Sequence, residues 1–204
     1  MVRLYRFHFS TNVERVALAL AYKRLETESV WVDPRDRTPV ERVSGQRLVP
    51  VVEDDGKVVF DSTAILRYLE DAYPEPGLYP RDPARHAELD VFIDWFNRVW
   101  KRPPNELEAE LLKAKPDRTY IDQLREQMVR HLAFHEALLT GRDYLFGEEF
   151  SAADCAAFPF LKYALAIEPE DDEPFHRILH EYQPIDDYPS LRAWIERVDQ
   201  RPRV

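Results

Sequence analysis

The chain has 204 residues, which is enough for one large or two small domains with a buried core. Its composition, 45% hydrophobic and 32% charged residues, is that of an ordinary globular protein. The net charge of −10 argues against a nucleic-acid or anionic-membrane partner, because both are bound by clustered Lys and Arg.

Taken in chain order, the first part of the sequence predicts alternating strands and helices. Short β-rich runs predict strands at residues 2–7, 30–32, 49–52 and 57–60. Apolar residues at helical spacing predict one helix over 13–21 and another that begins at Ser62, and the polar stretch 33–45 is long enough for a short helix. The predicted order is therefore β-α-β-α-β-β-α.

A proline-rich segment, residues 73–83, interrupts this pattern. Its four prolines exclude a helix or a central strand and are typical of an interdomain linker. Beyond it only helical periodicity remains, at residues 89–100, at 121–139, from Ser151 and at 191–198, and Pro103-Pro104 should end or kink the first of these helices. We therefore expect a front domain over 1–76, a linker over 77–84 and an all-helical second domain over 85–204.

Three short polar residues, Ser10-Thr11-Asn12, precede the first helix and are first of all an N-cap signal. Thr11 and Glu14 would form a capping box. The Ser10 hydroxyl is then left free at the carboxyl end of the strand, where it could donate a hydrogen bond to a bound thiolate beside the helix N-terminus. Lowering a thiol pKa by about 2 requires roughly 2.7 kcal/mol, which one charge-assisted hydrogen bond and a helix terminus can supply. In this hypothesis Ser10 is a donor and not a nucleophile.

Two further signals each have a structural and a ligand-binding interpretation. Pro50 stands at the start of a strand, where it cannot donate to the ladder. Either the strand is an edge strand, or a cis Val49-Pro50 bond turns the Val49 backbone toward an extended ligand. Asp61-Ser62 is either a helix cap, with Ser62 as N-cap, or a site whose N–H groups hold a ligand carboxylate while Asp61 pairs with an amino group.

These three signals, in this order and on this strand pattern, resemble the glutathione site of the glutathione S-transferase family. That family keeps its thiol-activating residue after strand one, a cis-proline before strand three and an acidic residue–Ser pair at the next helix start. Residues 150–154, Phe-Ser-Ala-Ala-Asp, resemble its capping box and hydrophobic staple in the second domain. The resemblance covers nearly the whole chain. It implies a thioredoxin-like α/β N-terminal domain followed by an all-α helical bundle.

The resemblance implies a serine-type (theta-, tau-, phi- or zeta-like) glutathione transferase of detoxification, which conjugates the glutathione thiolate to a small apolar electrophile without a metal or prosthetic group. The residues expected to bind glutathione are Ser10, Thr11, Asn12, Arg35, Arg37, Val49, Pro50, Asp61 and Ser62. Arg35 and Arg37 are placed at the glycine end of glutathione, with Gln46 as an alternative. Asn12, two residues after Ser10, also resembles nu-class proteins, which leaves a glutathione-dependent disulfide reductase open. A non-catalytic binding module of the same fold is a further alternative.

The resemblance also implies an acceptor pocket between the first loop and the long helix after the linker. Its candidate residues are Phe7, Trp95, Arg98 and Trp100, with core packing as the alternative for each tryptophan. It further implies a homodimer in which the front domain of one subunit meets the first long helices of the other.

The remaining signals bear on location and metals. No apolar run approaches the ~18 residues that span a bilayer, and the first ten residues read as a strand and not as a signal peptide. The single cysteine, Cys155, falls in an apolar helix and is expected to be buried, so a reducing, cytoplasmic location fits. His131/His135 and His176/His180 lie one helical turn apart without further ligands, so no metal site is expected.

Overall fold

The computed structural model describes all 204 residues, Met1 to Val204, as two compact units. The front unit comprises residues 1–86 together with 201–204, and the helical unit comprises residues 87–200. The last four residues therefore return to the front unit, which the sequence did not indicate. No helix is both long and apolar enough to cross a membrane.

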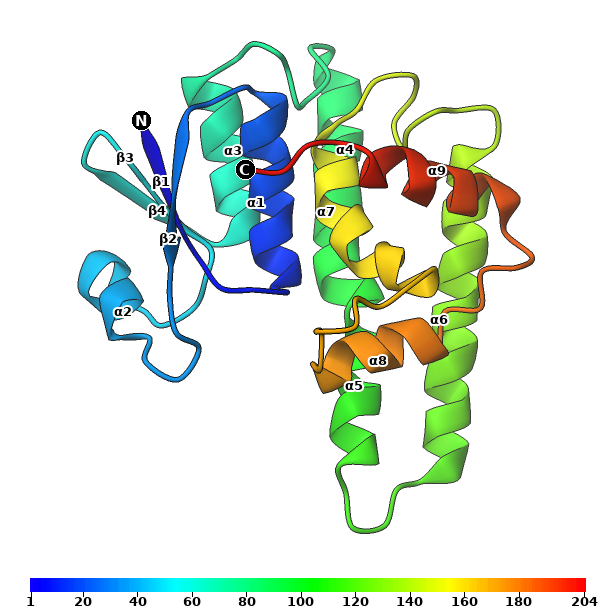
Figure 1. The fold of residues 1–204 in the computed structure, drawn as a ribbon. Helices are drawn as coiled ribbons and strands as arrows, with labels where there is room; N and C mark the ends of the chain where they lie inside the picture. The colour runs from blue at the N-terminus through cyan, green and yellow to red at the C-terminus, as the bar shows by residue number, and fades with distance from the viewer. The chain divides into compact units, whose positions relative to one another are not determined.

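The front unit has the predicted order of strands and helices, which confirms a thioredoxin-like α/β fold (Figure 1). Its elements are β1 (Val2–Arg6), α1 (Thr11–Tyr22), β2 (Thr27–Trp31), α2 (Thr38–Ser44), β3 (Val51–Asp54), β4 (Lys57–Phe60) and α3 (Ser62–Ala72). The sheet order is β2-β1-β3-β4, with β1 and β2 parallel and the other pairs antiparallel.

Both faces of this sheet are covered, by α1 and α3 on one side and by α2 on the other (Figure 1). Successive side chains of a strand point to opposite faces, so one strand serves both layers. Tyr5 and Val51 pack with Val40 of α2. The residues next to them, Leu4 and Val52, are fully buried on the opposite face.

The first predicted helix of the helical unit is present and ends before Pro103-Pro104, and the departure from the prediction follows it. The helical run consists of α4 (Pro83–Trp95) and a π-helical turn (Phe96–Trp100), after which α5 (Arg102–Leu111) begins. Pro103 and Pro104 thus start a helix, because a residue of the first turn needs no intrahelical N–H donor. The sequence did not predict α5.

The rest of the unit comprises α6 (Arg118–Leu139), α7 (Ala152–Leu161), a short 3₁₀ turn (Lys162–Ala164), α8 (Pro174–Glu181) and α9 (Pro189–Asp199). The capping box of Ser151 and Asp154 at α7 is confirmed. The buried Asp154 carboxylate also accepts hydrogen bonds from Leu145 N (3.0 Å) and Trp194 Nε1 (2.8 Å). Burial raises the pKa of Asp154, although these bonds oppose the rise. Cys155 is buried, as expected.

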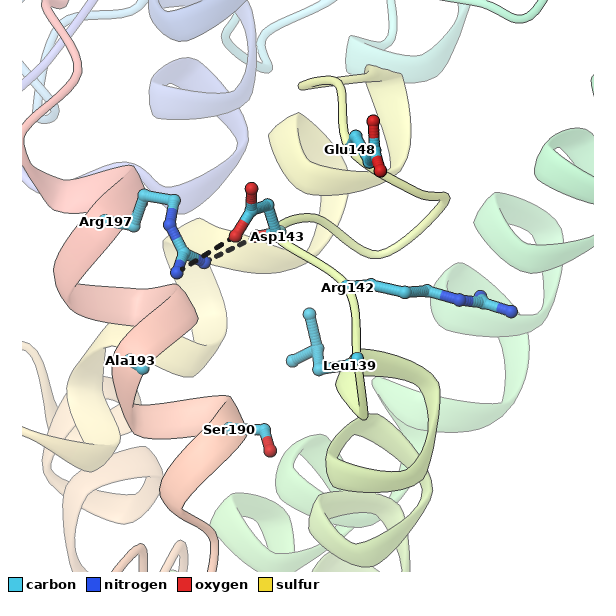
Figure 2. A pocket seen from close by; sticks show the side chains of 8 residues that line it. Leu139, Arg142, Asp143, Glu148, Ser190, Ala193 and Arg197 are labelled. Carbon is cyan, nitrogen blue, oxygen red and sulfur yellow. Dashed lines mark hydrogen bonds and ion pairs between the residues drawn. The ribbon is translucent and has the colours of Figure 1, made fainter.

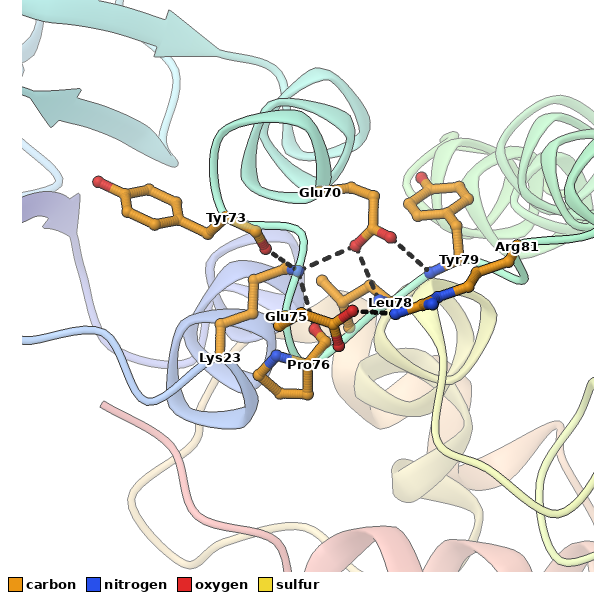
Figure 3. Close-up of polar contacts among 8 residues, drawn as sticks. All are labelled: Lys23, Glu70, Tyr73, Glu75, Pro76, Leu78, Tyr79 and Arg81. Carbon is orange, nitrogen blue, oxygen red and sulfur yellow. Dashed lines mark hydrogen bonds and ion pairs between the residues drawn. The ribbon is translucent and has the colours of Figure 1, made fainter.

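One buried ion pair holds the proline-rich segment against the helices of the front unit (Figure 3). Lys23, after α1, donates from Nζ to Glu70 Oε2 (2.9 Å) and to the carbonyls of Tyr73 (2.6 Å) and Pro76 (3.0 Å). Glu70 in α3 accepts from the backbone N–H of Leu78 (2.8 Å). All three Lys23 protons are therefore used, and the segment is tied to both α1 and α3.

Candidate functional site

Strand register brings three segments to one edge of the sheet. Tyr5 in β1 pairs with Val51 at the start of β3, and Val51 pairs with Phe60 at the end of β4. Because β3 is antiparallel to both neighbours, the carboxyl ends of β1 and β4 lie beside its beginning. The loop that carries Ser10, the Val49-Pro50 dipeptide and the start of α3 therefore share this edge.

Ser10, and not Thr11, is the N-cap residue of α1, which corrects the sequence-based expectation. The two adjacent residues are both good caps, but Ser10 has the extended backbone of an N-cap (φ −71°, ψ 110°) and Thr11 is already helical. Ser10 Oγ accepts a 3.4 Å hydrogen bond from Val13 N–H. Since this bond uses a lone pair, the Ser10 hydroxyl keeps its proton for donation to a ligand. Thr11 is buried, and Asn12 is half-buried.

Two strained residues flank the site. Phe9, just before Ser10, has φ 60°, and Asp61, just before Ser62, has φ 70°. A left-handed backbone costs a non-glycine residue on the order of 1–3 kcal/mol, and such residues cluster at functional sites. The surrounding structure must therefore hold both segments in place.

The start of α3 also differs from the prediction, because Asp61 is its N-cap. Asp61 Oδ1 accepts from the N–H groups of Thr63 and Ala64, both at 3.0 Å. Those two N–H groups are therefore occupied by the protein's own carboxylate. Ser62 is the first residue of the helix and is buried.

Ser62 is joined to a buried arginine that the sequence analysis did not assign to the site. Arg15 in α1 has no exposed surface, and its Nη1 donates to Ser62 Oγ at 3.4 Å. This contact connects the two helix starts and places a positive charge behind the Ser62 hydroxyl. The signal in the sequence is an arginine inside the apolar stripe of α1, where a charged residue is almost never fully buried unless it is paired.

The predicted cis Val49-Pro50 bond is confirmed. The Gln46 side chain is bonded to the Leu48 backbone through both its amide nitrogen (2.9 Å) and its oxygen (2.5 Å), so it shapes the approach to this bond and has little capacity for a ligand. The Arg37 guanidinium lies 5.3 Å from the centre of the Phe7 ring, which places it beside the loop of Ser10. Arg35 lies in an exposed turn, where its backbone N–H donates to Asp33.

The other predicted acceptor residues lie in the helical unit. Trp100 is buried, stacks on Phe96 with ring centres 4.4 Å apart and packs edge-on against Phe160. Trp95 is half-buried and contacts the ring of Phe134. Arg98 is exposed and paired with Asp94. Arg98 and Trp100 belong to the π-helical turn, a feature that occurs often at functional sites.

A separate cavity of about 340 Å³ in the helical unit contains none of the predicted site residues (Figure 2). Its wall includes Asp143 and Arg197, which pair with each other through an Nη1 bond to the Asp143 carbonyl (2.6 Å) and a 3.4 Å contact to its carboxylate. The arginine is therefore already neutralised. No group of three or more His, Cys, Asp or Glu residues is arranged to hold a metal ion.

The fold and the site together define a class of protein in which a thioredoxin-like front unit is followed by an all-helical unit. The family model "Glutathione S-transferase, N-terminal domain" matches residues 4–77, and "Glutathione S-transferase, C-terminal domain" matches residues 118–197. The chain belongs to the glutathione S-transferase family, and this membership supports a glutathione-dependent activity.

Individual relatives are diverse. The chain is 30% identical to FtsZ-localized protein A of Caulobacter vibrioides, over 98% of this chain and 87% of the relative. It resembles the crystal structure of a glutathione S-transferase from Rhodospirillum rubrum F11 (TM-score 0.77, 31% identity, 99% and 89% of the two chains). It also resembles that of the beta-etherase LigF from Sphingobium sp. strain SYK-6 (TM-score 0.78, 25% identity, 98% and 96% of the two chains).

Proposed function

We propose that the protein is a glutathione transferase that binds glutathione at the sheet edge described above and transfers its thiolate to a small apolar electrophile. The observation that carries this proposal is the register of β1, β3 and β4, which brings Ser10, Val49-Pro50 and Ser62 to one edge. We also propose that it acts in the cytoplasm.

In the proposed mechanism the Ser10 hydroxyl donates a hydrogen bond to the glutathione sulfur. Its oxygen already accepts from Val13 N–H, so the hydroxyl proton is the group that remains for the sulfur. The N-terminal end of α1 adds a positive potential at the same place. Together these favour the thiolate, whose electron pair attacks the electrophile while the leaving group departs with its own bonding pair.

The γ-glutamyl end of glutathione fits the start of α3. Arg15 donates to Ser62 Oγ, so the Ser62 proton is available to a ligand carboxylate, and the buried guanidinium favours the negative charge. Asp61 Oδ1 is used in the cap, which leaves Oδ2 for the ligand amino group. Val49 lies outside the sheet, since β3 begins at Val51, and is the proposed backbone partner of the extended tripeptide. Arg37, beside Phe7, is the proposed partner of the glycine carboxylate.

The assignment of Ser10 is tested by Ser10→Ala. We expect the pKa of bound glutathione to rise by about 1 to 2, and kcat/KM for conjugation of a chloronitrobenzene to fall roughly 10- to 100-fold, because one charge-assisted hydrogen bond is lost. Thiolate absorbance titration and steady-state kinetics measure the two effects. Thr27→Ala is the matched control, since its hydroxyl lies in β2 at the opposite edge and donates to the Leu25 carbonyl. Unchanged activity in Ser10→Ala would remove Ser10 from the mechanism.

Ser62 is tested separately by calorimetric titration of glutathione. We expect Ser62→Ala to weaken glutathione binding roughly tenfold with a native-like melting profile, because Asp61, and not Ser62, caps the helix. A lower melting temperature with unchanged affinity would show that Ser62 is structural.

The electrophile class and the alternative reaction are tested with the same preparations. A mixed disulfide tests reduction, which the Asn12 resemblance suggests. An aryl ether is a further substrate to test, because one similar structure is a beta-etherase. A non-catalytic binding module is the second candidate function, favoured by the similarity to a protein named for its localisation with FtsZ. Absence of glutathione binding at millimolar concentration would favour that candidate.

We also propose a homodimer. Exposed apolar side chains gather on α4 and α6, where Val91 is 68% and Phe134 42% exposed, and Trp95 lies against Phe134. Contiguous exposed apolar surface of this kind is typical of a protein–protein interface.

A further inference from the structure

Residues 201–204 leave α9 and return to the front unit, where they end beside α1 (Figure 1). Arg203 reaches Glu14 in the first turn of α1, with both Nε and Nη2 3.1 Å from Glu14 Oε1. Arg203 Nη1 also donates to the Arg201 carbonyl at 2.8 Å, which fixes the orientation of the guanidinium. The pair is largely shielded from water, with side-chain exposures of 24% and 16%.

The same tail has a second attachment point. Arg6, the last residue of β1, donates from Nη1 to the backbone oxygen of Val204 and to Ser29 Oγ (3.3 Å), and its guanidinium lies 4.6 Å from the centre of the Trp31 ring. Burial lowers the pKa of Arg6, and the nearby Glu14 charge opposes that shift, so Arg6 and Arg203 both act on one carboxylate.

The segment between these two attachment points carries the proposed catalytic residue. Arg6 immediately precedes the loop, and Glu14 follows it in the first turn of α1. Between them lie the strained Phe9 and the N-cap Ser10. Glu14 N–H donates to the Ser10 carbonyl at 3.0 Å, so a displacement of Glu14 is transmitted directly to Ser10.

We infer that Arg203 is a positioning residue for Ser10, and that residues 203–204 form a strap that holds the proposed thiolate-binding loop at both of its ends. This inference rests on the proposed function. Arg203 also neutralises Glu14, a carboxylate one helical turn from Ser10. With that cation removed, Arg6 alone offsets the Glu14 charge, so more of this charge opposes a thiolate at the same helix start.

The test is Arg203→Gln in the full-length protein. We expect the pKa of bound glutathione to rise, and kcat/KM to fall about three- to tenfold, a size typical of one shielded contact between neighbours. Arg203→Lys, which keeps the charge but loses the fork, should recover part of the activity. Arg201→Gln is the matched control from the same tail, since Arg201 lies over Tyr22 at the other end of α1.

A double variant identifies the route of the effect. If Arg203 acts through Glu14, Glu14→Gln combined with Arg203→Gln will be no worse than Glu14→Gln alone. Additive losses would overturn this route. Amide hydrogen exchange over residues 7–13 should be faster in Arg203→Gln than in Arg201→Gln, with or without glutathione.

The inference and the proposed function fail in different ways. If Ser10→Ala changes the thiol pKa and Arg203→Gln changes neither that pKa nor exchange in the loop, only the strap is wrong. If Ser10→Ala has no effect on activity or on the pKa of the glutathione thiol, the proposed function is wrong. Faster exchange in Arg203→Gln would then still support a strap on the loop, without a catalytic role.

Discussion

His135 is a buried titratable residue, enclosed in α6 by the rings of Phe92, Trp95 and Phe134. Its Nδ1 donates to the His131 carbonyl at 2.7 Å, so a second proton would have to bind Nε2, which is buried and has no partner. Burial accordingly lowers the pKa of His135 to about 4, although the bond to His131 opposes the shift. The neutral ring is thus part of the folded state.

Acidification should therefore destabilise the protein. The unfolded state binds a proton on His135 below about pH 6.5, and the folded state only below about pH 4. The free energy of unfolding therefore decreases as the pH is lowered from about 6.5 to about 4. We expect a loss on the order of 2 kcal/mol between neutral pH and about pH 5 from this residue. Urea unfolding at the two pH values measures it. The loss should shrink in His135→Leu and persist in His8→Gln, an exposed control. An equal loss in His135→Leu would contradict the assignment.

At the scale of single elements, the ion pair of Lys23 and Glu70 sets the path of the chain after α3. Its lysine side chain is fully buried and its glutamate is 19% exposed. Removing one partner leaves a buried charge and several linker backbone groups without partners, which typically costs 3–5 kcal/mol, whereas exposed ion pairs contribute about 0–1 kcal/mol.

We expect Lys23→Met to lower the free energy of unfolding by about 3 kcal/mol. The double variant Lys23→Met with Glu70→Leu should lose less than the sum of the single variants, because the two residues share one interaction. Glu126→Gln is the matched control, since its pair with Arg130 on α6 is exposed. A change in the control as large as that in Lys23→Met would rule out this account. Chemical denaturation measures the wild type, the two single variants, the double variant and the control.

The strand and helix order of the front unit followed from local periodicity, whereas the gathering of Ser10, Pro50 and Ser62 in one site was implied by the resemblance to the glutathione S-transferase family. Local patterns could not decide between two adjacent residues that are both good N-caps. In the structure Ser10 caps α1 in place of Thr11, and Asp61 caps α3 in place of Ser62.

Other parts of the structure depend on contacts far apart in the chain. Arg15 and Ser62, 47 residues apart, are joined by tertiary packing, and so are Glu14 and Arg203, 189 residues apart. The Pro103-Pro104 pair was ambiguous for another reason. Proline marks both the end of one helix and the first turn of the next, and only the structure assigns it to α5.

At the scale of the whole molecule, the proposed homodimer makes a direct prediction. Phe134→Asp places a charge in the exposed apolar patch on α4 and α6, and we expect it to shift the molecular mass in light scattering from dimer to monomer with little change in melting temperature. Leu112→Asp is the control, because Leu112 is 80% exposed and follows α5, outside the patch. A wild-type protein that is monomeric at assay concentration would contradict the proposal.

The return of residues 201–204 to the front unit has a topological consequence. The helical unit is an insertion, entered after His86 and left after Gln200, with both of its ends joined to the same partner. A single protease cut in the 77–84 segment would break the only covalent link between the helical unit and residues 1–76, but residues 201–204 would still hold the two fragments together through noncovalent contacts such as that of Arg203 with Glu14. Separating the two fragments after such a cut therefore also requires the ion pair of Arg203 and Glu14 to open.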